Sequence, residues 1–218
     1  MRRALALIVG LAAGLLALMP ARLLLPAPPL SAARVDGSIW RARLANAGLG
    51  NARLGDVSIA LAPAAILQGR AQWTMSGAMN GSLWRSLAGG GGEGLTGTLA
   101  GAPLPGLPVA GVQMNGVSLV VDGRGRCQSA SGTITVMLTT ALAGQRSVSG
   151  AARCDGAALV VPMASGDARV RLDLSATAAG WQARLNISGA NPAEAAGLAG
   201  AGFRSEAGAL VREEAQPW

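Results

Sequence analysis

Two cysteines, Cys127 and Cys154, carry the most reactive side chains in a sequence that otherwise offers little chemistry. Each precedes a strand-like run, in "CQSASGTITV" and in "CDGAALVV". The chain has no histidine, which is the commonest general base and a frequent metal ligand. The cysteines do not form a CxxC pair, and two cysteines without histidine do not make a zinc site. The sequence therefore predicts neither redox catalysis nor a metal centre.

Carboxylates offer little more, because the 11 acidic residues are spread thinly and most lie in predicted turns, such as Asp56, Asp122, Asp155 and Asp167. A glycosidase pair could still meet in space. The segment "GGGGEG" lacks the Gly-Lys-Ser/Thr ending of a phosphate-binding loop. We therefore predict no catalytic, metal-binding or cofactor-binding residue, and we predict that the chain is not an enzyme.

The net charge of +7 comes from 18 basic residues, all of them arginine. A nucleic-acid-binding protein gathers such charge on one surface and places aromatic side chains within it. Here the arginines are scattered, and Arg124 and Arg126 form the only short cluster. The charge therefore indicates a solvated surface and no nucleic-acid partner.

The N-terminal sequence "MRRALALIVGLAAGLLALMP" contains sixteen uncharged residues, 4–19, after Arg2 and Arg3. A helix of that length spans about 24 Å, and residues 23–25 can extend it. We expect an uncleaved transmembrane anchor over residues 1–25, with its N-terminus in the cytoplasm. The competing interpretation is a cleaved signal peptide, although small residues at the cleavage positions are poorly placed.

The remaining chain divides by composition into a proline-rich linker (26–34), a β-rich domain (35–211) and a polar tail (212–218) expected to be loose. Within the domain, short runs alternate apolar and polar residues, as in "RVRLDL", where Val170, Leu172 and Leu174 alternate with Arg169, Arg171 and Asp173. Such runs have one dry and one wet face. The prediction is a mainly β chain, in which the N-terminal transmembrane helix is followed by a curved antiparallel sheet with one or two short helices.

The two helices are expected in "APAAILQG" and in "NPAEAAGLAGAGF", where Asn191 is the predicted N-cap and Pro192 the first helical residue. The segment "AGGGGEGLTG" is expected to be flexible. Three tryptophans on the dry faces are predicted to have structural or interaction roles: Trp40, Trp73 and Trp181.

Two interpretations remain for Cys127 and Cys154. They are reduced and buried if the domain faces the cytoplasm, and they favour a disulfide if the anchor places the domain in an oxidising compartment. Neighbouring strand ends could bring the two Cα atoms within about 6 Å. The anchor makes the disulfide the preferred prediction.

The chain resembles the type II secretion system protein N family from the N-terminal segment to "LAGAGFRSEAGALV". The most specific marks are "VDGSIWRARL" and the Gly-flanked pair Cys127 and Cys154. The resemblance implies a single-pass protein of the bacterial inner membrane whose β-domain is periplasmic. It also implies a non-enzymatic role in exporting folded proteins across the outer membrane, with other secretion subunits and the inner membrane as partners.

The strand pattern is also similar to that of the AsmA-like group of membrane-tethered β-proteins. This similarity supplies an alternative function, the binding of a lipid or another hydrophobic molecule on the apolar face of the sheet. That face could instead be a closed core. The sequence leaves both arrangements open.

Overall fold

The computed structural model describes residues 30–101, 104, 106–142 and 144–217, and this part of the chain is almost entirely β-structure. The strands are β1 (Leu30–Ser31), β2 (Arg34–Ser38), β3 (Arg41–Leu49), β4 (Ala52–Leu61), β5 (Arg70–Gly77), β6 (Met79–Ser86), β7 (Gly89–Gly101), β8 (Val109–Asp122), β9 (Cys127–Leu142), β10 (Gln145–Ala151), β11 (Arg153–Asp155), β12 (Ala158–Ala164), β13 (Val170–Thr177), β14 (Gly180–Ser188), β15 (Arg204–Glu206) and β16 (Ala209–Pro217). Two short helices, α2 (Pro63–Leu67) and α3 (Pro192–Gly200), accompany them. The predicted mainly β domain is confirmed.

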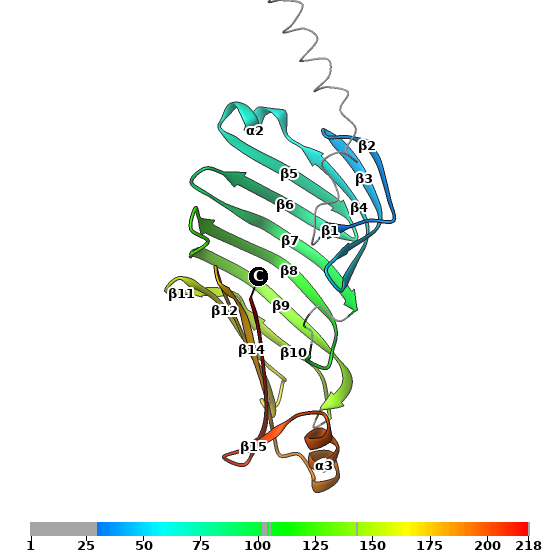
Figure 1. Cartoon of the computed structure of the whole chain (residues 1–218), viewed down its shortest axis with the longest axis vertical. Coiled ribbons are helices and arrows are strands. Elements are labelled where there is room, and N and C mark those ends of the chain that lie inside the picture. The colour runs from blue at the N-terminus through cyan, green and yellow to red at the C-terminus, as the bar shows by residue number, and fades with distance from the viewer. Residues whose placement is uncertain (1–29, 102–103, 105, 143, 218) are drawn as a thin grey trace, which may run out of the picture.

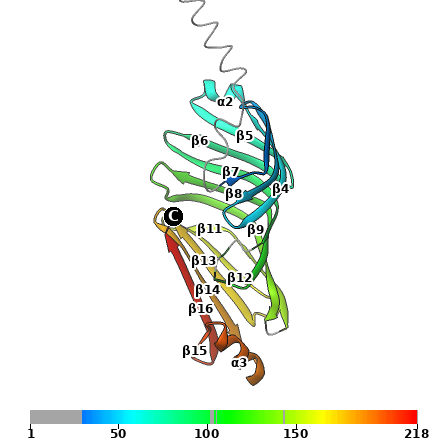
Figure 2. The same ribbon diagram turned by 45° about the vertical axis from the view of Figure 1, so that its right-hand side comes forward.

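The described strands form one 16-stranded sheet in which every pairing is antiparallel. From β3 to β10 the strands lie side by side in chain order, and β12, β13, β14 and β16 continue the sheet. Figure 1 shows this meander descending from α2 at the top to α3 at the bottom, and Figure 2 shows how strongly the sheet curves. Short turns between alternating runs produce such a meander.

One face of the sheet collects the apolar side chains, since residues that are paired across strands share a face. In the half of the sheet from β9 to β16, this face curls onto itself. Met163, Leu172 and Leu185 are cross-strand neighbours and are almost fully buried. Their core also contains Leu107 and Val109 at the start of β8 and Phe203 after α3. We call this part the closed half.

The half from β2 to β8 remains a single curved layer over much of its area, and we call it the open half. Leu44 and Val57 are buried midway along β3 and β4, and Ala52 and Met79 are buried at the end of the strands away from α2, where β4 also pairs with β7. Trp73 and Leu119, toward the α2 end, are only half-buried. The apolar face is therefore covered at one end of these strands and accessible at the other.

Glycines at a bulge between β8 and β9 contribute to the curvature. The register shifts between Asn115 and Ser118, and Gly116 has a φ of +61°. A Cβ atom at the facing Gly132 would lie 2.6 Å from the Cα of Val117, so no side chain fits there. A bulge of this kind bends its strand and increases the local twist.

The helix α3 begins as its sequence predicts. The Asn191 side chain accepts a hydrogen bond from the Glu194 N–H at 2.8 Å, and the Glu194 carboxylate accepts one from the Asn191 N–H at 3.0 Å. This capping box satisfies two N–H groups at the helix start, and Pro192 follows the cap. The expected helix in "APAAILQG" is also present as α2.

Two expectations about loose segments are wrong. The glycine-rich segment "AGGGGEGLTG", residues 88–97, lies almost wholly in β7, one of the longer strands. The polar residues 212–217 extend β16, which pairs with β14 over nine consecutive residues. Backbone pairing with neighbouring strands orders both segments, although their side chains do not suggest strands.

The predicted anchor, residues 1–25, lies outside the described residues, as does the linker up to residue 29. The linker residues from Leu30 onward are described and include β1. Within the described ranges, no helix is both long and apolar enough to cross a membrane.

Candidate interaction surfaces

The two cysteines are joined in a disulfide, with Cα atoms 5.6 Å apart. Cys127 is buried at the start of β9, and Cys154 is half-buried in β11. The Cys127 N–H also donates to the Ala157 carbonyl at 2.9 Å, which ties the same strand end to the β11–β12 turn. The disulfide predicted from the sequence is thus present in the structure, where it links β9 to β11 within the closed half.

The disulfide lies at a seam where the sheet is thinly paired. β10 pairs with β9 along most of its length, but only Ser149 and Ala164 are in register between β10 and β12. At Gly150, an added Cβ would lie 2.0 Å from the Pro162 carbonyl oxygen, so the two backbones approach closely there. We therefore regard the disulfide as a clamp across the weakest junction between neighbouring strands.

An apolar row crosses the open half about three residues from the α2 end of its strands. Register pairs Leu61 with Trp73, Trp73 with Leu83, Leu83 with Gly92, Gly92 with Leu119, and Leu119 with Ala130. All of these side chains therefore lie on the same face of the sheet. Most are half-buried, and Leu83 is 39% exposed, so the row lies on an accessible face of the sheet.

Glycines in β7 leave room for side chains of the neighbouring strand β6 and of β7 itself. A Cβ atom at Gly92 would lie 2.8 Å from Leu95 Cδ1 and 3.2 Å from Leu83 Cδ2. On the opposite face, a Cβ at Gly91 would meet the Trp84 ring at 3.3 Å and the Leu119 carbonyl oxygen at 2.2 Å. The sequence analysis did not single out Trp84. Assigning "GSLWRS" and "GGGG" to neighbouring strands is the signal that could have found it, because Trp84 then lies opposite Gly91.

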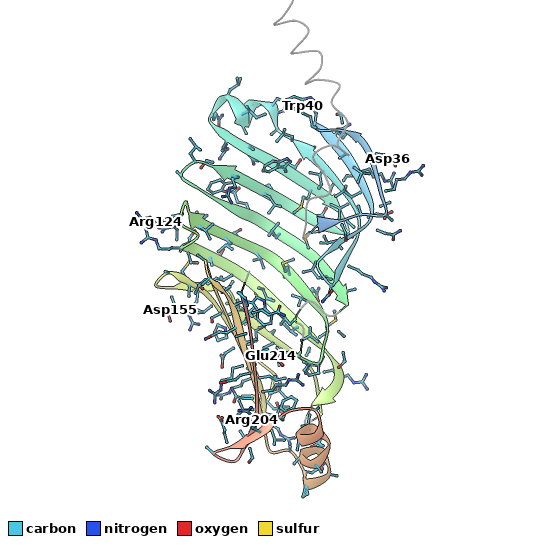
Figure 3. All side chains as sticks on the ribbon, viewed as in Figure 1. Asp36, Trp40, Arg124, Asp155, Arg204 and Glu214 are labelled. Atoms are coloured by element: carbon cyan, nitrogen blue, oxygen red, sulfur yellow. A yellow bond between two sulfur atoms is a disulfide. The ribbon has the colours of Figure 1, made fainter. Side chains whose placement is uncertain are left out.

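The three tryptophans singled out from the sequence do not form one site. Trp40 lies in the β2–β3 turn, where its carbonyl accepts from the Leu61 N–H at 3.0 Å, so it is beside the end of the apolar row that contains Trp73. Trp181 is in β14, paired with Ala176 and packed against the closed core. Figure 3 shows Trp40 at the top of the molecule and Glu214 in the lower half; Glu214 lies on β16, which pairs with the strand that carries Trp181.

A polar groove of about 510 Å³ lies over the closed half and is lined by charged side chains from β11, β13, β14 and β16. Register aligns Asp173, Arg184 and Glu213 in one cross-strand row. Arg184 forms ion pairs of 2.7 Å with Glu213 and with Glu206. Arg153 and Asp155 line the β11 side of the groove. Such exposed pairs contribute little stability, so the groove is mainly a surface that carries alternating charges.

The shifted carboxyl groups in the described part of the chain belong to turns. The Arg126 backbone N–H donates to Asp122 and lowers the pKa of that carboxyl, with further donors from the Arg126 side chain and the Arg124 N–H. The Ser165 hydroxyl likewise lowers the pKa of Asp167. A general acid needs a raised pKa, so these two carboxyls have the opposite property. The described residues contain no cluster of three or more metal-ligating side chains.

These features define a curved antiparallel β-domain that is half open and half closed, with a disulfide between β9 and β11. A family model described as "Type II secretion system (T2SS), protein N" matches residues 28–211. The match covers most of the chain, which therefore belongs to the type II secretion system protein N family. No match was found among curated proteins or among solved structures.

Proposed function

We propose that this protein is a non-enzymatic component of the type II secretion system that is anchored in the inner membrane. Its β-domain lies in the periplasm, docks on other secretion subunits and so assists the export of folded proteins across the outer membrane. The observation that carries the proposal is the family match, which spans the whole β-domain apart from the end of β16. The disulfide supports an oxidising compartment for this domain.

The polar groove is the surface we assign to subunit docking. Its charged residues come from a well-buried half of the molecule, so their positions are fixed by the sheet rather than by loops. Glu213 and Asp173 flank Arg184 in register, which presents alternating negative and positive charges in a line. Such a pattern selects a partner segment with the reverse charge order.

Site-specific photo-crosslinking in cells tests this assignment. A crosslinking residue at Gln182, in the groove, should capture a secretion subunit, whereas one at Thr98, on an exposed part of β7, should not. Arg184→Glu should lower both capture and secretion, and Arg171→Glu, on the same face but outside the ion pairs, should not. Capture of no secretion subunit, with secretion unchanged when the gene is deleted, would contradict the proposed function.

A second candidate function is the binding of a lipid acyl chain on the apolar row. The specific observation is that Leu61, Trp73 and Leu119 are only half-buried while the equivalent face of the closed half is covered. An acyl chain lying along the row would bury this surface. Native mass spectrometry of gently purified protein should then detect bound lipid, and Leu119→Arg should abolish it. Absence of lipid from the unaltered protein removes this candidate.

A further inference from the structure

The large exposed apolar side chains of the described residues all fall in one short segment. Leu67 and Leu87 are almost fully exposed, at 91% and 103%, and Ile66 is 45% exposed. Leu83, from the apolar row, is 39% exposed. Single exposed leucines are ordinary on protein surfaces, but four within residues 66–87 are a patch that needs an explanation.

Register brings Ile66, Leu67 and Leu87 to the same end of the strands, where successive turns form one rim of the sheet. Arg70, just after α2, pairs with Ser86, so the α2–β5 connection lies beside the β6–β7 turn that carries Leu87. A Cβ at Gly123 would lie 3.3 Å from the Leu87 carbonyl oxygen, so the β8–β9 turn with Arg124 is next along the edge. Strands are about 4.8 Å apart, so the three turns follow one another at about 10 Å intervals.

Arginines surround these apolar tips. Arg70, Arg85 and Arg124 are exposed, and none of them forms an ion pair among the described residues. The nearest carboxylate along this edge, Asp122, is already paired with Arg126 at 2.7 Å. Figure 3 shows Arg124 at the left-hand edge of the sheet, below α2. We call the six residues Ile66, Leu67, Arg70, Arg85, Leu87 and Arg124 the rim patch.

We propose that the rim patch docks the β-domain on an anionic lipid surface. Leucine tips enter the headgroup region of the bilayer, and the arginines contact lipid phosphates while their stems lie along the apolar boundary. Separate tips on successive turns suit a bilayer, because a protein interface concentrates its energy in one contiguous, well-packed centre. The excess of unpaired positive charge selects anionic over zwitterionic lipid.

The test uses the full chain in vesicles and one fluorescent probe. Both native cysteines are disulfide-bonded, so Leu87→Cys provides a single thiol for an environment-sensitive dye. Ala78→Cys is the matched control, because it lies in the β5–β6 turn at the opposite end of the same strands. Vesicles of phosphatidylcholine alone are compared with vesicles that also contain phosphatidylglycerol, both carrying nitroxide-labelled lipid as a quencher.

We expect quenching at position 87, but not at position 78, and only in vesicles that contain phosphatidylglycerol. Replacing Arg70 or Arg124 by glutamine should lower the docking equilibrium about fivefold for each arginine. Arg70 is the exposed first residue of β5 and Arg124 lies on an exposed turn, so these substitutions should leave the fold intact, which circular dichroism checks. Incorporation into phosphatidylcholine vesicles tests the membrane anchor of the proposed function separately from the rim patch.

Equal quenching at both positions, or none at position 87, overturns the lipid proposal. The proposal is also overturned if position 87 is shielded from a water-soluble quencher in native envelope membranes but not in vesicles of pure lipid. In that case the rim patch is an interface with another protein.

Discussion

Removal of the disulfide should destabilise the domain by an amount that the loop length determines. Cys127 and Cys154 are separated by 27 residues. In the chain-entropy relation, closing a loop of that length lowers the entropy of the unfolded chain enough to stabilise the folded state by about 3.5 kcal/mol at 25 °C. For a domain of this size, the corresponding decrease in melting temperature is roughly 10 °C.

Urea denaturation of the oxidised full chain, followed by tryptophan fluorescence, measures the effect. Cys127→Ala, Cys154→Ala and the double variant should each lose about the same 3.5 kcal/mol, because each removes the same cross-link. Reduction of the unaltered protein should reproduce that loss. Hydrogen exchange should also accelerate at the Cys127 amide, which donates to Ala157 across the seam.

Additivity of the two single variants would refute this reasoning, since it would mean that each cysteine acts through its own packing. A loss below about 1 kcal/mol would also refute it, because the backbone pairing and the shared core would then hold the seam without the clamp. The control is Ser149→Ala in the same seam, which keeps the register pair with Ala164 and should change stability little.

Three further predictions concern the two halves and the turns. Leu172→Ala and Leu185→Ala in the closed core should each cost about 2–5 kcal/mol in urea denaturation, whereas Leu83→Ala in the open half should cost less than about 1 kcal/mol; equal costs would mean that the open face is covered. Gly91→Ala should destabilise by about 1–3 kcal/mol, because its Cβ would lie 2.2 Å from the Leu119 carbonyl oxygen, while Gly166→Ala, with open space around it, should be nearly neutral. Hydrogen bonds lower the folded-state pKa of Asp122, so the stability that its carboxylate contributes is fully present above the ordinary pKa of 3.8 and is lost as the pH falls through the lowered pKa. Asp122→Asn should remove that part of the acid dependence of stability. An unshifted pKa for Asp122, measured by NMR, would contradict this prediction.

Much of the fold could be predicted from the sequence, because strict alternation has only one physical interpretation. The runs around Leu172 and Leu185 have period two with charged alternates, and they form β13 and β14 with the predicted dry face inward. The Asn191 cap and Pro192 were equally readable, because capping is a local property of a few residues. The disulfide followed from the even cysteine count and the expected compartment.

Other features depend on contacts between distant segments, and the sequence does not display these. Gly91 and Gly92 look like part of a flexible linker, because the local sequence does not show that they leave room for Trp84, Leu83 and Leu95. The polar residues 212–217 look like a loose tail, because the pairing that orders them comes from β14. The division into open and closed halves is likewise set by curvature, which bulges at residues such as Gly116 produce.

The disulfide at the seam between β10 and β12 affects how the strands that carry the apolar face are arranged. The row that begins at Leu61 ends at Ala130, close along β9 to Cys127, and the disulfide partner Cys154 pairs with Leu159, which lies in register with Ala176 and then Trp181. The disulfide therefore fixes β9, where the accessible row ends, relative to β11 and the strands of the covered face that pair next to it. Because β10 and β12 share a single register pair, backbone pairing alone sets this relation weakly. A chain of this sequence kept in a reducing compartment would lose this cross-link between β9 and β11. The position of β11, which lines the polar groove, would then depend on its pairing with β12 and on the single register pair between β10 and β12.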